Sequence, residues 1–114
     1  MKHIHFKATV RLKRWTKAIH RMFDAVEQTM NMFVWCPEIV ITSINDSVHG
    51  AKSRHYTDEA IDLRTRNFTN EADKIAFIIE LRAELGPKFT VLHESRGTSN
   101  EHIHVQVVKG GTYP

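Results

Sequence analysis

The hydrophobic pattern of this 114-residue chain switches between the period of a β-strand and that of an α-helix, which limits the folds it can adopt. Strand-like segments, which alternate apolar and polar residues or are rich in β-branched residues, occur at 3–12, 38–43, 60–64, 88–94 and 102–108. Helix-like segments with a recurring apolar stripe occur at 16–33 and 69–87. The order β-α-β-β-α-β-β predicts an α+β domain, with two helices on one face of a small, mainly antiparallel sheet.

Both helical segments carry signals for where they end. Asn70 is a preferred N-cap residue, and Asp73 follows three positions later. The pair Gly86-Pro87 predicts the end of the second helix, because glycine favours the position after a helix and proline cannot continue one. Pro37 follows the first helical segment and is expected to close it.

Length and composition narrow the classes of protein. With 114 residues, 41% of them hydrophobic, the chain is expected to form a single domain over 1–114. A net charge of +3 without a long run of Lys or Arg argues against a nucleic-acid partner. The single cysteine, Cys36, excludes an intrachain disulfide and is expected to be a small buried apolar residue.

Two further expectations concern location and assembly. No run of eighteen apolar residues occurs, so we expect no membrane insertion. The N-terminal stretch "MKHIHFKATVRLKRW" lacks the continuous apolar core of a signal peptide, so the protein is expected to be made in the cytoplasm and delivered elsewhere by another route. We also expect a monomer.

Asp62 raises a chemical question, because core-forming residues flank it. A buried carboxylate is costly unless it is paired or binds a metal. Side chains alternate along a strand, so Asp62, His102 and His104 are all expected on the polar faces of their strands, where they could converge on a cleft. His55 lies in the loop that leads into the segment 60–64. Two imidazoles and one carboxylate, with a fourth position left to water, are typical of a catalytic Zn²⁺ site.

The segments "SRHYTDEAIDLR" (53–64) and "EHIH" (101–104) resemble the zinc DD-peptidases. That family includes D-alanyl-D-alanine carboxypeptidases and phage L-alanyl-D-glutamate endolysins, and its fold is shared with the hedgehog signalling domain. The family pattern is Ser-x-His-x6-Asp, followed far downstream by Glu-x-x-His. The matching positions in this chain are Ser53, His55 and Asp62 for the first motif, and Glu101 and His104 for the second.

The resemblance implies a role for each matched position. His55, Asp62 and His104 would be the zinc ligands, and Ser53 would contact the substrate. Glu101 would be the general base that takes a proton from the attacking water. If the last strand already begins at Glu101, however, its side chain points away from His104, and Glu94 across the hairpin is the alternative base.

Two positions depart from the family pattern. Asp58 stands where many members have glycine, and "INDS" after the segment 38–43 lacks an arginine that stabilises the oxyanion in many enzymatic members. The residues that could replace this arginine are Arg54, Arg64, Arg66, His49 and His102. Arg64 is favoured because it is expected to share a strand face with Asp62. Ser53, Arg64, His49 and His102 are therefore candidate substrate-binding residues.

Three functions remain open from the sequence. The resemblance implies a zinc metallopeptidase of phage or bacterial origin that hydrolyses a peptide bond in peptidoglycan stem peptides, at the cell wall and by metal-activated water. Which bond is cut stays open. The first alternative is a non-catalytic zinc-binding module of the same fold. The second, with less support, is a basic nucleic-acid-binding domain.

Overall fold

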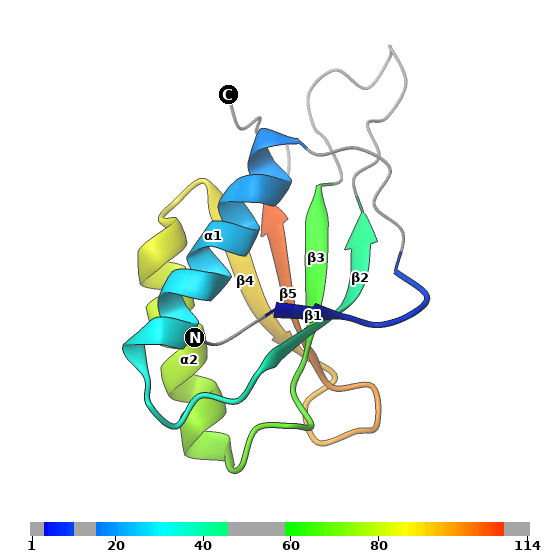
Figure 1. Ribbon diagram of the computed structural model, residues 1–114, viewed down its shortest axis with the longest axis vertical. Coiled ribbons are helices and arrows are strands. Elements are labelled where there is room, and N and C mark those ends of the chain that lie inside the picture. The colour runs from blue at the N-terminus through cyan, green and yellow to red at the C-terminus, as the bar shows by residue number, and fades with distance from the viewer. Residues whose placement is uncertain (1–3, 11–15, 46–58, 109–114) are drawn as a thin grey trace.

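The computed structural model describes residues 4–10, 16–45 and 59–108. Two helices and five strands lie within these ranges. In chain order they are β1 (Ile4–Phe6), α1 (Lys17–Met32), β2 (Ile39–Asn45), β3 (Ala60–Arg64), α2 (Glu71–Leu85), β4 (Phe89–Glu94) and β5 (His102–Val107). Their order along the chain is the predicted one (Figure 1).

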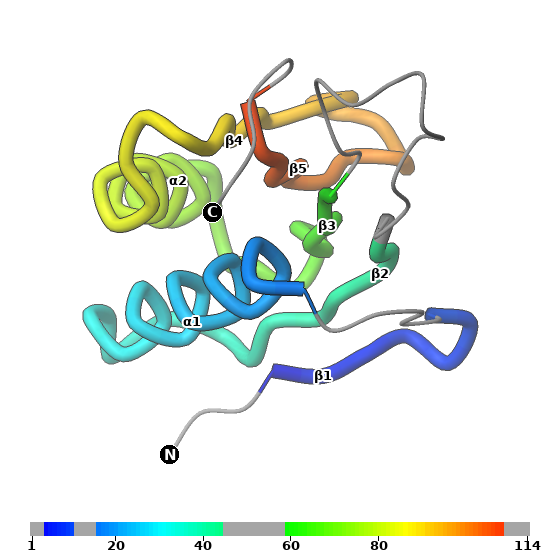
Figure 2. Tube along the Cα trace, turned by 90° about the horizontal axis from the view of Figure 1, so that it is seen from above, coloured from blue at the N-terminus to red at the C-terminus, as the bar shows by residue number. Residues whose placement is uncertain are grey.

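The strands form one sheet in the order β1-β2-β3-β5-β4. Only the β1–β2 pairing is parallel, and the pairings β2–β3, β3–β5 and β4–β5 are antiparallel. Figure 2 shows the sheet curving around the two helices, which lie together on one side of it. The predicted α+β fold, with a mainly antiparallel sheet and two packed helices, is therefore confirmed.

The alternation of side chains along β3 and β5 separates a buried face from an outer face. Ile61 and Leu63 on β3, and Ile103 and Val105 on β5, are at most 1% exposed and pack in the core with the helices. Residues between them on the same strands, including Asp62, are only partly buried. The polar residues of these strands therefore lie on the face away from the helices.

Local capping explains where the helices begin and end. Asn70 is the N-cap of α2, and its Oδ1 accepts a hydrogen bond of 2.9 Å from the backbone N–H of Asp73, as predicted. Gly86 ends this helix with φ = +79°, a conformation that favours glycine. Thr16 caps α1 through its bond with Ile19 N. Helix α1 ends at Met32, before Pro37 is reached.

The first strand is much shorter than the predicted segment 3–12. Within the described part of this segment, residues 4–10, the strand that pairs with β2 at the edge of the sheet is Ile4–Phe6. The chain then turns, because the backbone N–H of Val10 donates to Lys7 O at 3.0 Å. Phe6 stays 51% exposed and contacts the ring of Phe23 edge-on. Alternation alone cannot show that a strand lacks a pairing partner along part of its length.

Two smaller expectations can be compared with the structure. Cys36 is buried in the hydrophobic core, as expected. None of the helices in the described ranges has the length and apolar character needed to cross a membrane.

Candidate functional site

The antiparallel pairing of β3 with β5 places Asp62 directly opposite His104. Their side chains meet on the outer face of the sheet, where Nδ1 of His104 donates to Oδ1 of Asp62 at 2.7 Å. These residues are 42 positions apart in the sequence, so the contact depends on strand register. Two of the three predicted zinc ligands are thus adjacent.

A second carboxylate–imidazole pair lies beside the first one. Residue His102 of β5 pairs with Arg64 of β3 on one side and with Glu94 of β4 on the other. Its Nε2 is 3.0 Å from Glu94 Oε1, and its Nδ1 is 2.6 Å from the backbone oxygen of Asn100. The outer face therefore carries two imidazoles and two carboxylates on three neighbouring strands.

These contacts favour the protonated form of both imidazoles. The hydrogen bond to Asp62 raises the pKa of His104 above its ordinary value against the opposing effect of burial, and the contact of Nε2 with Gln106 Oε1 at 2.6 Å adds to it. Burial lowers the pKa of His102, but the bonds to Asn100 O and Glu94 and the nearby charge of Asp62 outweigh it, so that this pKa is also raised. Each imidazole must lose a proton before it can bind a metal.

The other predicted site residues fall into two groups. His55, His49 and Ser53 lie outside the described residues, in the segment 46–58 between β2 and β3. Arg64 lies on the outer face, directly opposite His102. Asp62, His104, His102 and Arg64 are therefore brought together, as the alternation of their strands predicts.

A cleft of about 440 Å³ opens beside Asp62. Predicted site residues Asp62, Arg64, Glu101 and His102 contribute to its lining. All of its other lining residues carry a positive charge or a hydroxyl or amide group, namely Lys7, Thr42, Thr65, Arg66, Thr98, Ser99 and Asn100. The cleft is thus a polar cavity at the end of the sheet where β3, β5 and the β4–β5 loop meet.

An irregularity in β2 brings Thr42 into this cleft. The β2–β3 register shifts between Ile41, which pairs with Leu63, and Ser43, which pairs with Asp62. Thr42 is the extra residue, and its hydroxyl donates to the backbone oxygen of Asp62 at 3.4 Å. A bulge of this kind redirects a side chain next to a functional site.

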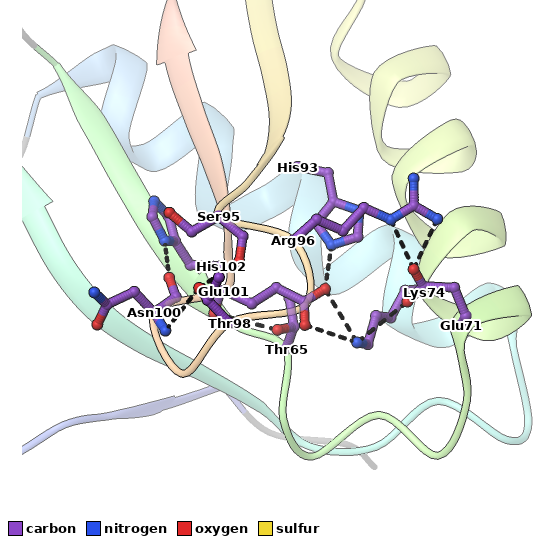
Figure 3. A network of polar contacts seen from close by, with 10 residues as sticks. All are labelled: Thr65, Glu71, Lys74, His93, Ser95, Arg96, Thr98, Asn100, Glu101 and His102. Carbon is purple, nitrogen blue, oxygen red and sulfur yellow. Dashed lines mark hydrogen bonds and ion pairs between the residues drawn. The ribbon is translucent and has the colours of Figure 1, made fainter.

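The carboxylate of Glu101 is bound by Lys74 and His93, which lie on the helix-facing side of the sheet (Figure 3). Glu101 directly precedes β5, and Nζ of Lys74 on α2 donates to both of its carboxylate oxygens at 3.0 and 3.1 Å. His93 Nε2 forms a second close contact with this carboxylate. His93 follows Phe89 and Val91, which are buried, on the same face of β4. The structure therefore pairs Glu101 with Lys74 and His93 and pairs Asp62 with His104.

Glu71, His93 and Glu101 form a group that could hold a metal ion, because each offers a ligand atom within 4.8 Å of the others. Two cations already contact these carboxylates. Lys74 Nζ lies 3.3 Å from Glu71 Oε1, and Arg96 donates to Glu71 Oε2 at 2.7 Å. Burial raises the pKa of Glu101, but the hydrogen bonds of His93 and Lys74 outweigh burial and lower this pKa.

Two lysines that the sequence did not single out contribute to this region: Lys74 binds Glu101, and Lys7 lines the cleft. Lys74 lies three residues after Glu71 on α2, a spacing that predicts a surface ion pair and nothing more. Its contact with Glu101 depends on where the β4–β5 loop packs against α2. Lys7 belonged to a predicted regular strand, and its place in the cleft follows from the early end of β1.

Comparisons of the chain with protein-family models, with curated proteins and with solved structures found no match.

Proposed function

We propose that this protein is a zinc-dependent peptidase that acts on peptidoglycan stem peptides at the cell wall. The observation that carries the proposal is the contact of Asp62 with His104, side by side on the outer face and next to a polar cleft. The two motifs that resemble the zinc DD-peptidases contribute the same two residues, and they supply His55 as the third ligand. The substrate class rests on this resemblance.

The donor atoms at Asp62 and His104 fit a zinc ion. Two ligand atoms about 2.0–2.1 Å from a tetrahedral zinc ion lie about 3.3 Å apart. The nitrogen and oxygen atoms are 2.7 Å apart as they stand, so they need to separate by only about 0.6 Å to accept an ion. A carboxylate with an imidazole also belongs to the ligand set of catalytic zinc sites.

The alternative metal group is a poorer fit. An ion bound by Glu71, His93 and Glu101 would replace the ammonium group of Lys74, which contacts both carboxylates. The ammonium group of Lys74 already neutralises these two carboxylates. If a metal ion displaced it, the charged Lys74 side chain, which is only 15% exposed, would lose its ion-pair partners.

In the proposed reaction, different residues of the outer face bind the metal, transfer the proton and stabilise the developing charge. A zinc ion held by His55, Asp62 and His104 would polarise the peptide carbonyl and lower the pKa of water. Glu94 is the favoured proton carrier, because it lies on the same face and touches His102. Arg64 lies opposite His102, where its guanidinium can neutralise charge that develops on the carbonyl oxygen.

Metal analysis of purified variants tests the ligand set. Wild-type protein is expected to hold one zinc ion per chain, and Asp62→Ala, His104→Ala and His55→Ala are each expected to lose it. His93→Ala is the matched control, because it removes an imidazole from the alternative group. Loss of zinc from His93→Ala, with full zinc in the other three variants, would move the metal to the helix-facing group.

Peptide release from purified peptidoglycan tests the chemistry. Removal of a general base typically slows a reaction about a hundred- to ten-thousandfold. Glu94→Gln is expected to show a loss of this size at equal zinc loading, whereas Glu101→Gln is expected to retain most of the rate. The reverse result would return the role of base to Glu101. If wild-type protein holds zinc but releases no fragments, the protein is a zinc-binding module and the peptidase proposal fails.

A further inference from the structure

The imidazole ring of His104 has a different partner at each of its two nitrogens. Its Nδ1 lies 2.7 Å from Oδ1 of Asp62, on the neighbouring strand β3. Its Nε2 lies 2.6 Å from Oε1 of Gln106, two residues further along β5. A neutral imidazole carries a proton on only one nitrogen, and a metal binds the nitrogen without it. The partners of His104 can therefore decide which nitrogen is available to a metal.

Strand geometry fixes the position of Gln106 beside His104. Residues two positions apart on a strand share a face, so both side chains lie on the outer face of β5. Strand β5 is paired on both sides, and Gln106 lies opposite Ala60 of β3 and Thr90 of β4. Both of these neighbours have short side chains, whereas the glutamine side chain is long enough to reach the ring of His104.

The chemistry of Gln106 determines the direction of its hydrogen bond. The carbonyl oxygen of a glutamine side chain only accepts hydrogen bonds, so the contact with Oε1 requires a proton on Nε2 of His104. Across from His104 on β4 stands Leu92, whose side chain has no polar group. Asp62 is itself a proposed zinc ligand, and Nδ1 has to give up its proton when both residues bind one ion. The proton on Nε2 can stay in place.

The neighbouring imidazole, His102, is arranged differently. Its Nδ1 lies 2.6 Å from the backbone oxygen of Asn100, and its Nε2 lies 3.0 Å from Oε1 of Glu94. Neither of these oxygen atoms belongs to a proposed zinc ligand. Of the two imidazoles on the outer face, His104 is therefore the one that directs a ring nitrogen to Asp62.

We propose that Gln106 is a positioning residue of the metal site, which holds the proton of His104 on Nε2 and leaves Nδ1, beside Asp62, as the ligand atom. This inference rests on the proposed zinc site and adds a residue that neither motif contains. A histidine that binds a metal commonly donates its other ring N–H to an acceptor, which fixes both the tautomer and the orientation of the ring. Gln106 supplies that acceptor from the same strand.

Long-range ¹H–¹⁵N NMR of the imidazole rings in zinc-loaded protein tests the assignment of the ligand atom. The His104 ring is expected to carry its proton on Nε2, with Nδ1 bound to the metal. A proton on Nδ1 would make Nε2 the ligand atom and reduce Asp62 to its hydrogen-bond partner, which would overturn the inference.

Substitution of Gln106 tests its part in zinc binding. Gln106→Leu removes the acceptor and is expected to weaken zinc binding about ten- to a hundredfold, and to let the proton of the zinc-loaded His104 ring appear on either nitrogen. Gln106→Glu should bind zinc at least as tightly as wild type, because its carboxylate accepts the same hydrogen bond. Gln28→Leu, the same change at an exposed position of α1, is the control.

Two results with these variants would contradict the proposal. The first is wild-type zinc affinity, or an unchanged His104 spectrum, in Gln106→Leu. The second is an equal loss of affinity in Gln106→Leu and Gln106→Glu, which would attribute the loss to packing and not to the hydrogen bond.

The failure of this inference can be told apart from that of the peptidase proposal. Zinc bound through Nδ1 and weakened by Gln106→Leu, in a protein that releases nothing from peptidoglycan, would support the role of Gln106 and reject the peptidase. Hydrolysis of peptidoglycan with equal zinc affinity in wild type and Gln106→Leu would support the peptidase and reject the role of Gln106. A wild-type protein that binds no zinc would reject both.

Discussion

Glu101 and Glu94 show how two carboxylates at the ends of one hairpin acquire different surroundings. Glu94 ends β4 on the outer face and is 42% exposed, with His102 as its neighbour. Glu101 precedes β5, is 12% exposed and is bound by Lys74 and His93. A carboxylate held by an ammonium and an imidazole is stabilised as an anion and is a weak base. These contacts therefore favour a structural role for Glu101, in which its ion pairs with Lys74 and His93 stabilise the fold.

The contribution of Glu101 to stability should be visible in the pH dependence of the free energy of unfolding. Because the folded-state pKa of Glu101 is lowered, its contribution to stability is present above the unfolded pKa of about 4.3 and is lost as the pH falls through the folded pKa. Glu101→Gln should lower the free energy of unfolding by about 1 kcal/mol near neutral pH and flatten its decline in acid. Urea unfolding between pH 3 and 7 measures both quantities.

Glu27→Gln is a suitable comparison for this experiment, because it makes the same change at an exposed position of α1. If the free energy of unfolding depends on pH in the same way in both variants, the contacts of Lys74 and His93 with Glu101 do not stabilise the fold.

At the scale of elements, α2 has one face in the core and one in solvent. Ile78 is 4% exposed and packs in the core, whereas the next residue, Ile79, is 54% exposed. Sequence alone does not distinguish them, since both are isoleucines within the apolar run of 75–79. Only the position of the helix on the sheet decides which one is buried.

Truncation of these two isoleucines should therefore have unequal effects. Ile78→Ala is expected to lower the free energy of unfolding by about 2–5 kcal/mol, because it leaves a cavity in the core. Ile79→Ala should change it by about 0.5 kcal/mol or less, and it serves as the control for helix propensity. Chemical denaturation of the two variants at one pH makes the comparison. Similar losses would show that α2 packs with another face inward.

At the scale of the whole molecule, β3 and β5 connect the candidate site to the core. The same strands that carry Asp62 and His104 on the outer face bury Ile61 and Ile103 on the other. A ligand that binds only the folded arrangement stabilises the entire fold by mass action. Metal binding at the outer face should therefore be visible in global unfolding.

Thermal unfolding with and without zinc tests this coupling. At a zinc concentration about 100 times the dissociation constant, the folded state should gain about 2.7 kcal/mol, and the melting temperature should rise by roughly 10 °C. Asp62→Asn should abolish most of the rise, whereas Asp24→Asn, at an exposed position of α1, should retain it. An equal rise in both variants would mean that zinc binds away from Asp62.

The sequence by itself determined the class of fold and the side of the sheet on which Asp62, His102 and His104 lie. Both follow from local rules: apolar residues recur with the period of their element, and side chains alternate along a strand. The cap at Asn70 was equally readable, because a capping bond joins residues only three positions apart.

Tertiary structure alone decided which of these residues touch. The Asp62–His104 contact needs the register of β3 against β5, and Glu101 meets Lys74 only because the β4–β5 loop packs beside the first turn of α2. The place of Lys7 in the cleft depends on where β1 stops pairing with β2. Such contacts join residues far apart in the chain, and their energy comes from packing that no short stretch of sequence contains.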